Sequence, residues 1–185
     1  MAKLILGIAG EMGSGKEAIS THLVQNYQAS AHNFAQILND ILGRLYLEIT
    51  RENQTPLSGF LRKTFGEDIL AKAMYHDSAK DAHDIVVVQG IRRFEDITYL
   101  KQLPNFKFIF VEADMKLRYE RTKKRNEKAN DSTITFEEFE KSHKYETELQ
   151  ITDLKNYADH VINNNETYQE LYKQVDEIIK KYITK

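Results

Sequence analysis

The sequence has no cysteine, no tryptophan and only two prolines among its 185 residues. The lack of cysteine excludes disulfides, thiolate metal sites and cysteine nucleophiles, and fits a reducing compartment. A formal net charge of −2 provides no basic field over the whole chain that would favour nucleic acid or an anionic membrane surface. The apolar run Leu4–Ala9 is too short for a signal peptide or a membrane span. We expect a cytoplasmic protein with no nucleic-acid partner and no membrane partner.

The composition that is present is typical of a folded domain, with 41% hydrophobic and 29% charged residues. A chain of 185 residues has room for one compact α/β domain and hardly for two independent cores. We therefore predict a single domain over residues 1–185. Its expected parts are a core of residues 1–35, 81–114 and 155–185, a mostly helical insertion at 36–80, and a lid at 115–150.

Short apolar runs alternate with helical patterns along the chain. The predicted strands cover residues 4–9, 29–34, 85–88, 106–111 and 160–162. The predicted helices run up to residue 27 and over residues 36–51, 57–80, 94–103, 116–128, 136–148 and 168–182, with a break near Thr55–Pro56. This alternation predicts a parallel sheet covered by helices on both faces, with ligands at the carboxyl ends of its strands.

Residues 10–16, GEMGSGK, fit the spacing G-x-x-x-x-G-K between the first strand and the first helix. In such a loop the glycines let backbone N–H groups converge on phosphate oxygens, and the lysine reaches the terminal phosphates. The alternative is a glycine-rich turn that binds nothing. The predicted nucleotide-binding residues here are Gly10, Glu11, Met12, Gly13, Ser14, Gly15, Lys16, Glu17 and Ala18.

Glu17 follows the lysine at the position where Ser or Thr usually contributes a hydroxyl to Mg²⁺. A carboxylate here could contact the metal directly or through water. It could also repel nucleotide phosphates, or serve only as an acidic residue in the first turn of a helix. We retain Glu17 as the candidate metal residue.

Gln89 ends the third predicted strand where an acidic metal-binding residue is expected. An amide is a poorer Mg²⁺ partner than a carboxylate. Either Glu17 supplies the missing negative charge, or both metal contacts have been lost.

Three arginines follow the fourth strand at positions 118, 121 and 125. Spacing of i, i+3 and i+7 puts Arg118, Arg121 and Arg125 on one helix face, where they could meet a phosphate. The alternative is a solvated basic face paired with neighbouring glutamates.

Together with this loop, the segments Gln89–Arg93, Arg118–Arg125 and Ala158–Asn164 resemble the P-loop nucleoside-monophosphate-kinase-like family over essentially the whole chain. Within it the chain is most similar to dephospho-coenzyme A kinases, deoxynucleoside monophosphate kinases, animal phosphomevalonate kinases and archaeal AMP/CMP-kinase-like proteins. The resemblance implies a three-layer P-loop NTPase fold with a five-stranded parallel sheet in 2-3-1-4-5 order. It also implies ATP and Mg²⁺ as cofactors, a helical substrate-binding region at 36–80 and a lid.

The resemblance further implies roles for matching residues. Lys16 would hold the β- and γ-phosphates, Arg62 and Arg92 the phosphate of an acceptor, and Arg118, Arg121 and Arg125 would close over the transferring group as catalytic lid residues. The residues expected near the adenine are Asn163, Asn164 and Asn165. The chain departs from its relatives at Asn39, where they have an arginine.

Two further interpretations come from position alone. Asp40, early in the second helix, could orient an acceptor hydroxyl, or be a helix cap or surface charge. Tyr168 and Tyr172, at i, i+4 spacing in the last helix, are expected to be core contacts.

The sequence thus predicts an ATP-dependent phosphotransferase that acts on a small phosphorylated acceptor, a nucleoside or deoxynucleoside monophosphate. Dephospho-coenzyme A is the alternative acceptor. The alternative function is a catalytically weakened nucleotide-binding regulatory protein, which Glu17, Gln89 and Asn39 would favour.

Overall fold

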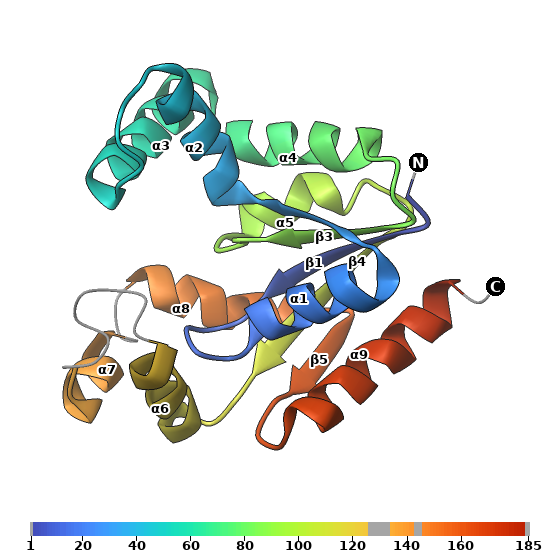
Figure 1. Ribbon diagram of the computed structural model, residues 1–185. Coiled ribbons are helices and arrows are strands. Elements are labelled where there is room, and N and C mark those ends of the chain that lie inside the picture. Colours follow the sequence, from blue (N-terminus) through green and yellow to red (C-terminus); the bar gives the residue numbers. More distant parts are fainter. Residues whose placement is uncertain (1, 126–133, 143–145, 184–185) are drawn as a thin grey trace.

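The computed structural model describes residues 2–125, 134–142 and 146–183, with the backbone alone for residues 125, 142 and 146–149. One parallel sheet runs through the middle of the domain (Figure 1), and its strand order is β2-β3-β1-β4-β5. The strands are β1 (Leu4–Ala9), β2 (Ser30–Asn33), β3 (Ile85–Gln89), β4 (Phe106–Glu112) and β5 (His160–Asn163). Every neighbouring pair is parallel. The predicted α/β fold class and its 2-3-1-4-5 order are confirmed.

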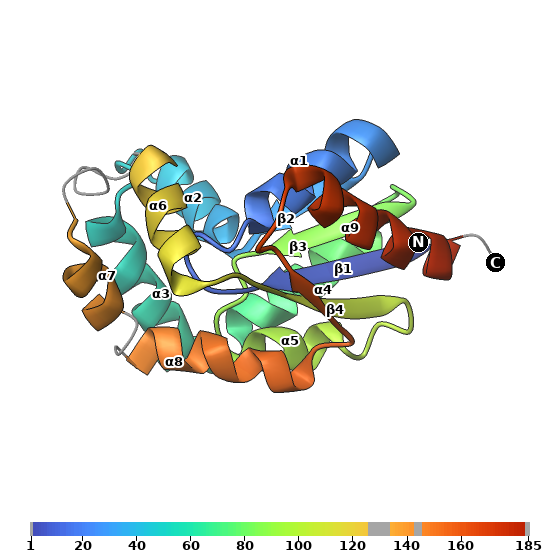
Figure 2. The same cartoon turned by 90° about the horizontal axis from the view of Figure 1, so that it is seen from below.

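Two apolar layers form on the two faces of this sheet because its strands alternate. In β1, Leu4, Leu6 and Ile8 face one layer, whereas Ile5 and Ala9 face the other. The first layer is completed by α1 (Lys16–Tyr27) and α9 (Tyr168–Ile183). The second is completed by α4 (Ile69–Lys80), α5 (Phe94–Leu100) and the end of α8 (Glu146–Asp153), as Figures 1 and 2 show. The sheet is therefore buried on both sides, and ligands can reach it at the carboxyl ends of the strands.

The helical insertion consists of α2 (Phe34–Arg44), α3 (Arg51–Phe65) and α4. The predicted break near Thr55–Pro56 is wrong, because α3 continues through Pro56. A proline in the second turn costs the helix one N–H bond but keeps a helical φ. The chain instead leaves helical geometry at Tyr46 and Gly66, whose φ angles are 57° and 106°. None of the residues in α3 is buried, so this helix lies on the outside of the insertion.

The predicted lid contains α6 (Met115–Arg125) and α7 (Phe136–Ser142), followed by α8. The end of the expected helix 116–128 lies outside the described residues. The expected helix at 136–148 is helical over 136–142 and 146–148, where α7 and the start of α8 lie, and its residues 143–145 lie outside the described residues. Residues 154–157 form a short 3₁₀ helix that leads into β5. Of the helices described, none is long and apolar enough to cross a membrane.

Candidate functional site

The loop between β1 and α1 has the tight geometry that its glycines predict. Gly13 and Gly15 have φ angles of 77° and 102°, which residues other than glycine rarely adopt. There is also no room for a side chain, because a Cβ at Gly13 would lie 2.5 Å from the carbonyl oxygen of Arg118. A Cβ at Gly15 would collide with the amide nitrogen of Asn164. The loop therefore packs directly against α6 and against the turn after β5.

Lys16 is the first residue of α1, and its side chain folds back over the loop. Its Nζ donates to the carbonyl oxygens of Gly10 at 2.7 Å and Glu11 at 2.8 Å, and lies 3.5 Å from Ser14 Oγ. Ser14 is fully buried, and its N–H donates to the Glu11 carbonyl at 3.2 Å. The ammonium group is thus held at the mouth of the loop, where the positive end of the α1 dipole also points.

A cavity of about 360 Å³ opens beside this loop, between α1, α6 and the start of α9. It is lined by Gly13, Gly15, Lys16, Glu17, Ala18, Arg121, Thr122, Lys124 and Tyr168. Among the described lining residues, Lys16, Arg121 and Lys124 are cationic and Glu17 is the one carboxylate. This charge suits a polyanionic ligand such as a phosphate chain.

Sequence reasoning missed three lining residues of the cavity: Thr122, Lys124 and Tyr168. The expectation that Tyr168 is a core contact is wrong, because it is 58% exposed and lines the cavity. It does stack on Tyr172, with ring centroids 6.0 Å apart, and Tyr172 stacks on His22 at 4.2 Å. The position of Tyr168 at the first turn of α9 was the available signal, since an i, i+4 pattern at a helix end often extends beyond the core.

The arginines of α6 have different surroundings. Arg118 is buried at 3% exposure, and its guanidinium lies 3.1 Å from a carboxylate oxygen of Glu11. Arg121 lines the cavity and donates to the carbonyl oxygen of Asn164 at 3.0 Å. Arg125 is the last residue of α6, and its side chain lies outside the described residues. Arg118 and Arg121 both face the phosphate-binding loop, but of these two only Arg121 is among the residues lining the cavity.

The asparagines after β5 support the loop from the other side. Asn164 is 1% exposed, and its Nδ2 donates to the Ser14 carbonyl at 2.7 Å. Its own N–H donates to the Glu112 carbonyl at 2.8 Å, which ties the turn to β4. Asn165 Oδ1 accepts from the N–H of Asp114 at 2.7 Å. Their expected place near an adenine remains a prediction, as does that of Asn163, which Gln174 contacts at the end of β5.

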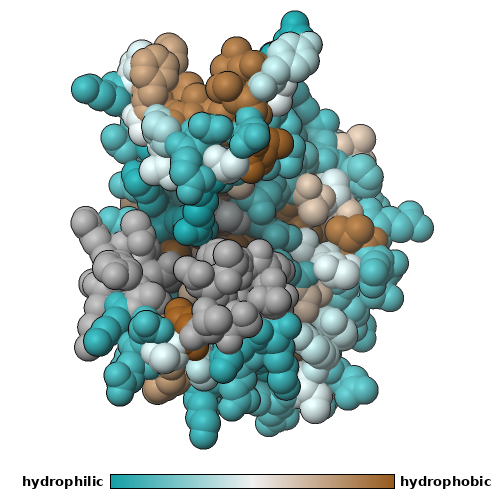
Figure 3. Space-filling view, turned by 60° about the vertical axis from the view of Figure 1, so that its left-hand side comes forward, coloured by the Kyte–Doolittle hydropathy of each residue, from teal (hydrophilic) through white to brown (hydrophobic). Residues whose placement is uncertain are grey.

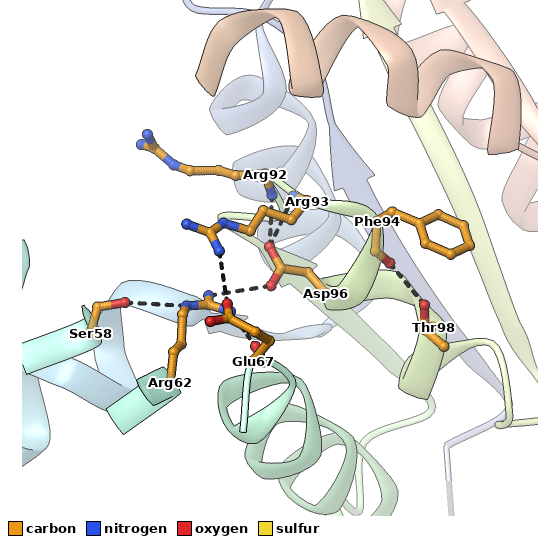
Figure 4. Close-up of polar contacts among 8 residues, drawn as sticks. All are labelled: Ser58, Arg62, Glu67, Arg92, Arg93, Phe94, Asp96 and Thr98. Atoms are coloured by element: carbon orange, nitrogen blue, oxygen red, sulfur yellow. Dashed lines mark hydrogen bonds and ion pairs between the residues drawn. The ribbon is translucent and has the colours of Figure 1, made fainter. Parts of the chain in front are cut away.

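A second group of charged residues lies where β3 ends and α5 begins (Figure 4). Asp96 is 2% exposed, and one of its oxygens accepts from the N–H groups of Arg92 at 3.0 Å and Arg93 at 3.1 Å. Its other oxygen lies 3.6 Å from the guanidinium of Arg62. Burial raises the pKa of Asp96, while these N–H groups and the charge of Arg62 oppose that rise.

The two predicted phosphate-binding arginines of this group are held differently. Arg62 is positioned by Asp96 and by a 2.6 Å bond to the carbonyl oxygen of Glu67. Arg92 is exposed, and its side chain extends away from Asp96 (Figure 4). Arg93 turns back to pair with Glu67 at 3.3 Å.

Asp40 does not join these arginines. It is exposed, accepts from Gln36 at 2.6 Å, and lines a separate cavity of about 160 Å³ between β2, α2 and α4. Asn39, at the position where relatives have an arginine, accepts from Gln54 at 2.6 Å and so joins α2 to α3. The structure therefore gives Asp40 no contact with the Arg62 group.

The structure offers little to a metal beyond Glu17 at the cavity wall. Gln89 ends β3 as the register partner of Asn33, beside the strand that leads into the phosphate-binding loop. Within the described ranges, no three His, Cys, Asp or Glu side chains are grouped as a metal site.

Comparison with known proteins gives relatives along the whole chain. No family model matches. A "UPF0200 protein" of Staphylothermus marinus is 28% identical, with 100% of this chain and 96% of that protein covered. A "UPF0200 protein" of Sulfurisphaera tokodaii is 29% identical, with 97% of each covered.

Solved structures that are similar in fold include small-molecule kinases. A gluconokinase from Sinorhizobium meliloti has a TM-score of 0.60 at 11% identity, covering 98% of this chain and 95% of its own. A shikimate kinase from Bacteroides thetaiotaomicron has a TM-score of 0.58 at 13% identity, covering 96% and 97%. At this identity the likeness shows the fold, which is that of the P-loop kinases. The family resemblance seen in the sequence is confirmed at that level.

Proposed function

We propose that the protein is an ATP-dependent phosphotransferase that transfers the γ-phosphoryl group to a small phosphorylated acceptor, a nucleoside or deoxynucleoside monophosphate. The observation that carries this proposal is the cavity beside the loop at 10–16, with Lys16, Arg121 and Lys124 in its wall. Phosphoryl transfer asks a protein mainly to align two ligands and to neutralise charge on the transferring oxygens. Cationic side chains on a fixed loop and helix meet that demand.

The residues fit the phosphates of ATP. The loop glycines carry no Cβ, and a Cβ there would collide with neighbouring atoms. A phosphate could therefore approach the backbone N–H groups of the loop closely. Lys16 Nζ would exchange its bonds to the loop carbonyls for phosphate oxygens. Tyr168, exposed at the far wall of the cavity, offers an aromatic surface to a base.

Glu17 fits a supporting role for Mg²⁺. This ion keeps several waters and usually takes one or two carboxylates together with substrate phosphates. Glu17 supplies one carboxylate at the cavity wall. When bound, the ion would neutralise charge on the phosphates; the protein's own contribution would come from Lys16 and Arg121.

Arg62 and Arg92 are the proposed holders of the acceptor's phosphate. Both contact Asp96, one through its guanidinium and the other through its backbone N–H, so a single buried carboxylate relates their positions. Because guanidinium groups bind phosphate with two parallel N–H donors, two arginines can fix both its place and its orientation. Arg92 follows the end of β3, and Arg62 of α3 reaches the same place through Asp96, so an acceptor held by both would lie at the same edge of the sheet as the loop after β1.

A second candidate function is a nucleotide-binding regulatory protein with weakened catalysis. Gln89 in place of an acid and Asn39 in place of an arginine favour it, since Asn39 is engaged with Gln54. Losing one metal contact would cost about 3 kcal/mol of transition-state stabilisation, or roughly a hundredfold in rate.

The decisive experiment measures ADP release with and without Mg²⁺ across nucleoside monophosphates, deoxynucleoside monophosphates, dephospho-coenzyme A and phosphomevalonate. We expect turnover with one nucleotide class, abolished in Lys16→Met. Lys3→Met is the matched control, because Lys3 forms an exposed ion pair with Asp84 at 2.8 Å far from the loop. Binding of ATP without turnover on any acceptor would leave the regulatory function. Turnover with dephospho-coenzyme A alone would select the alternative acceptor.

Gln89→Glu separates the two functions further. If the missing acid limits the rate, this substitution raises Mg²⁺-dependent turnover by about tenfold or more. An unchanged or lower rate would mean that Glu17 already supplies the charge or that Gln89 has another role.

A further inference from the structure

We infer that Arg118 is a positioning residue that neutralises Glu11, the carboxylate carried inside the phosphate-binding loop, and thereby sets the affinity of the loop for phosphate. This inference rests on the proposed binding of nucleotide phosphates to residues 10–16. It assigns Arg118 a role different from that of a lid residue that touches the transferring group.

The geometry of Arg118 is that of a support for the loop. Its guanidinium lies 3.1 Å from a carboxylate oxygen of Glu11, and the side chains are only 3% and 19% exposed. A second guanidinium nitrogen, Nη1, lies 3.4 Å from the carbonyl oxygen of Met12. Its own carbonyl oxygen sits against Gly13, where a Cβ would come within 2.5 Å. Arg118 therefore contacts three successive residues of the loop.

Arg118 is also held by residues just before α6, within α6 and in α7. Its Nε donates to the carbonyl oxygen of Ala113 at 3.0 Å, just before α6 begins. It also lies 6.0 Å from the ring centre of Phe139, a fully buried residue of α7. Thr122 Oγ1 donates to the Arg118 carbonyl at 2.8 Å. These contacts keep Arg118 directed at Glu11.

The charge of Glu11 explains why such a support is needed. A carboxylate on a loop that gathers phosphates repels them, and the repulsion is strong where water is largely excluded. An ion pair with a buried guanidinium cancels that field locally. Arg121, the first α6 residue among those lining the cavity, is left to meet the ligand.

The test measures equilibrium binding of ATP, of inorganic tripolyphosphate and of adenosine to Arg118→Met, Glu11→Gln and the double variant. We expect Arg118→Met to weaken ATP and tripolyphosphate by about tenfold or more, because Glu11 is then unopposed. Glu11→Gln should bind both at least as tightly as the wild type, and the double variant should return to within about threefold of the wild type. Adenosine binding should not change. Arg93→Met is the matched control, because Arg93 pairs with Glu67 away from the loop.

Each variant is also followed by thermal unfolding, since removing one member of a buried ion pair destabilises a fold. If Arg118→Met does not fold, Glu11→Gln and the double variant still decide the question. Weaker tripolyphosphate binding in Glu11→Gln, or a double variant as weak as Arg118→Met, would overturn the inference and leave a purely structural role. A wild-type protein that binds neither ATP nor tripolyphosphate would overturn the proposed function as well.

Discussion

The two sides of the site differ in how firmly the fold holds them. On the side of the loop at 10–16, Ser14, Arg118 and Asn164 are polar residues at or below 3% exposure, each contacting another segment. On the side of the helical insertion, α3 has no buried residue and Tyr46 is 90% exposed. Figure 3 shows apolar side chains gathered over this upper end of the molecule, above a mostly hydrophilic surface.

This difference indicates that the side of the loop at 10–16 is firmly held and the side of the helical insertion is less constrained. Buried polar groups must be hydrogen-bonded, so the loop has few alternative arrangements. The insertion is anchored near the site by the Arg62–Asp96 contact, while Arg92 is exposed. Regions with few buried contacts open at low free-energy cost.

The largest effect is expected when the same substitution is made on each side. Gly15→Ala puts a Cβ against the Asn164 amide at a φ of 102°, so nucleotide affinity should fall at least about a hundredfold. Gly59→Ala, in α3, meets nothing within 4 Å and should stabilise the fold by about 0.5–1 kcal/mol. ATP titration and urea unfolding measure both. The comparison would be contradicted if the two substitutions changed nucleotide affinity and unfolding free energy equally.

Packing should show the same contrast in unfolding free energy. Met74 of α4 is 1% exposed, whereas Phe60 of α3 is 60% exposed. Met74→Ala should cost about 2–5 kcal/mol through a core cavity, and Phe60→Ser about 0.5 kcal/mol or less. Urea unfolding measures the two variants. A large loss in Phe60→Ser would mean that α3 is more tightly packed than its exposure indicates.

A smaller effect is expected at the anchor of the acceptor side. Asp96→Asn keeps the shape but presents no charge to Arg62, so the KM for the acceptor should rise about tenfold while the Kd for ATP is unchanged. Asp68→Asn is the control, because Asp68 forms a partly exposed pair with Lys72 at 3.1 Å and does not contact Arg62. Steady-state kinetics and ATP titration separate the two quantities. A matching loss of ATP affinity would show that the two sides are not independent.

The smallest effect is expected in how the stability of the fold depends on pH, through His160 in β5. Burial, together with the charges of Lys181 and Lys107, lowers the pKa of His160 in β5 below its ordinary 6.5. As the pH falls below 6.5, the unfolded chain binds the proton more readily than the folded chain. The contribution of His160 to stability is therefore fully present above pH 6.5 and is lost below it. We expect His160→Gln to reduce this dependence by about 2 °C in Tm between pH 7 and 5. An identical pH profile in the variant would contradict the assignment.

Local pattern was enough to predict the fold and the loop. Most strands are short apolar runs whose side chains alternate between the two faces of the sheet, and GEMGSGK has the spacing of a tight glycine-rich turn between a strand and a helix. The sequence wrongly predicted a helix break near Pro56. A proline in the second turn removes one hydrogen bond, and α3 continues despite that loss. Tyr168 was missed because the same i, i+4 pattern serves both packing and exposure at a helix end.

By itself, then, the sequence determined the strand order through its family resemblance, the place of the glycine-rich loop at 10–16 and the candidate charged residues. Only the tertiary structure decided what each arginine meets: Glu11 for Arg118, the cavity for Arg121, Asp96 for Arg62. The physical reason is that helical spacing fixes which face a side chain occupies, whereas its partner comes from a segment far away in the chain. These long-range contacts decide whether an arginine lines a cavity or supports a neighbouring segment.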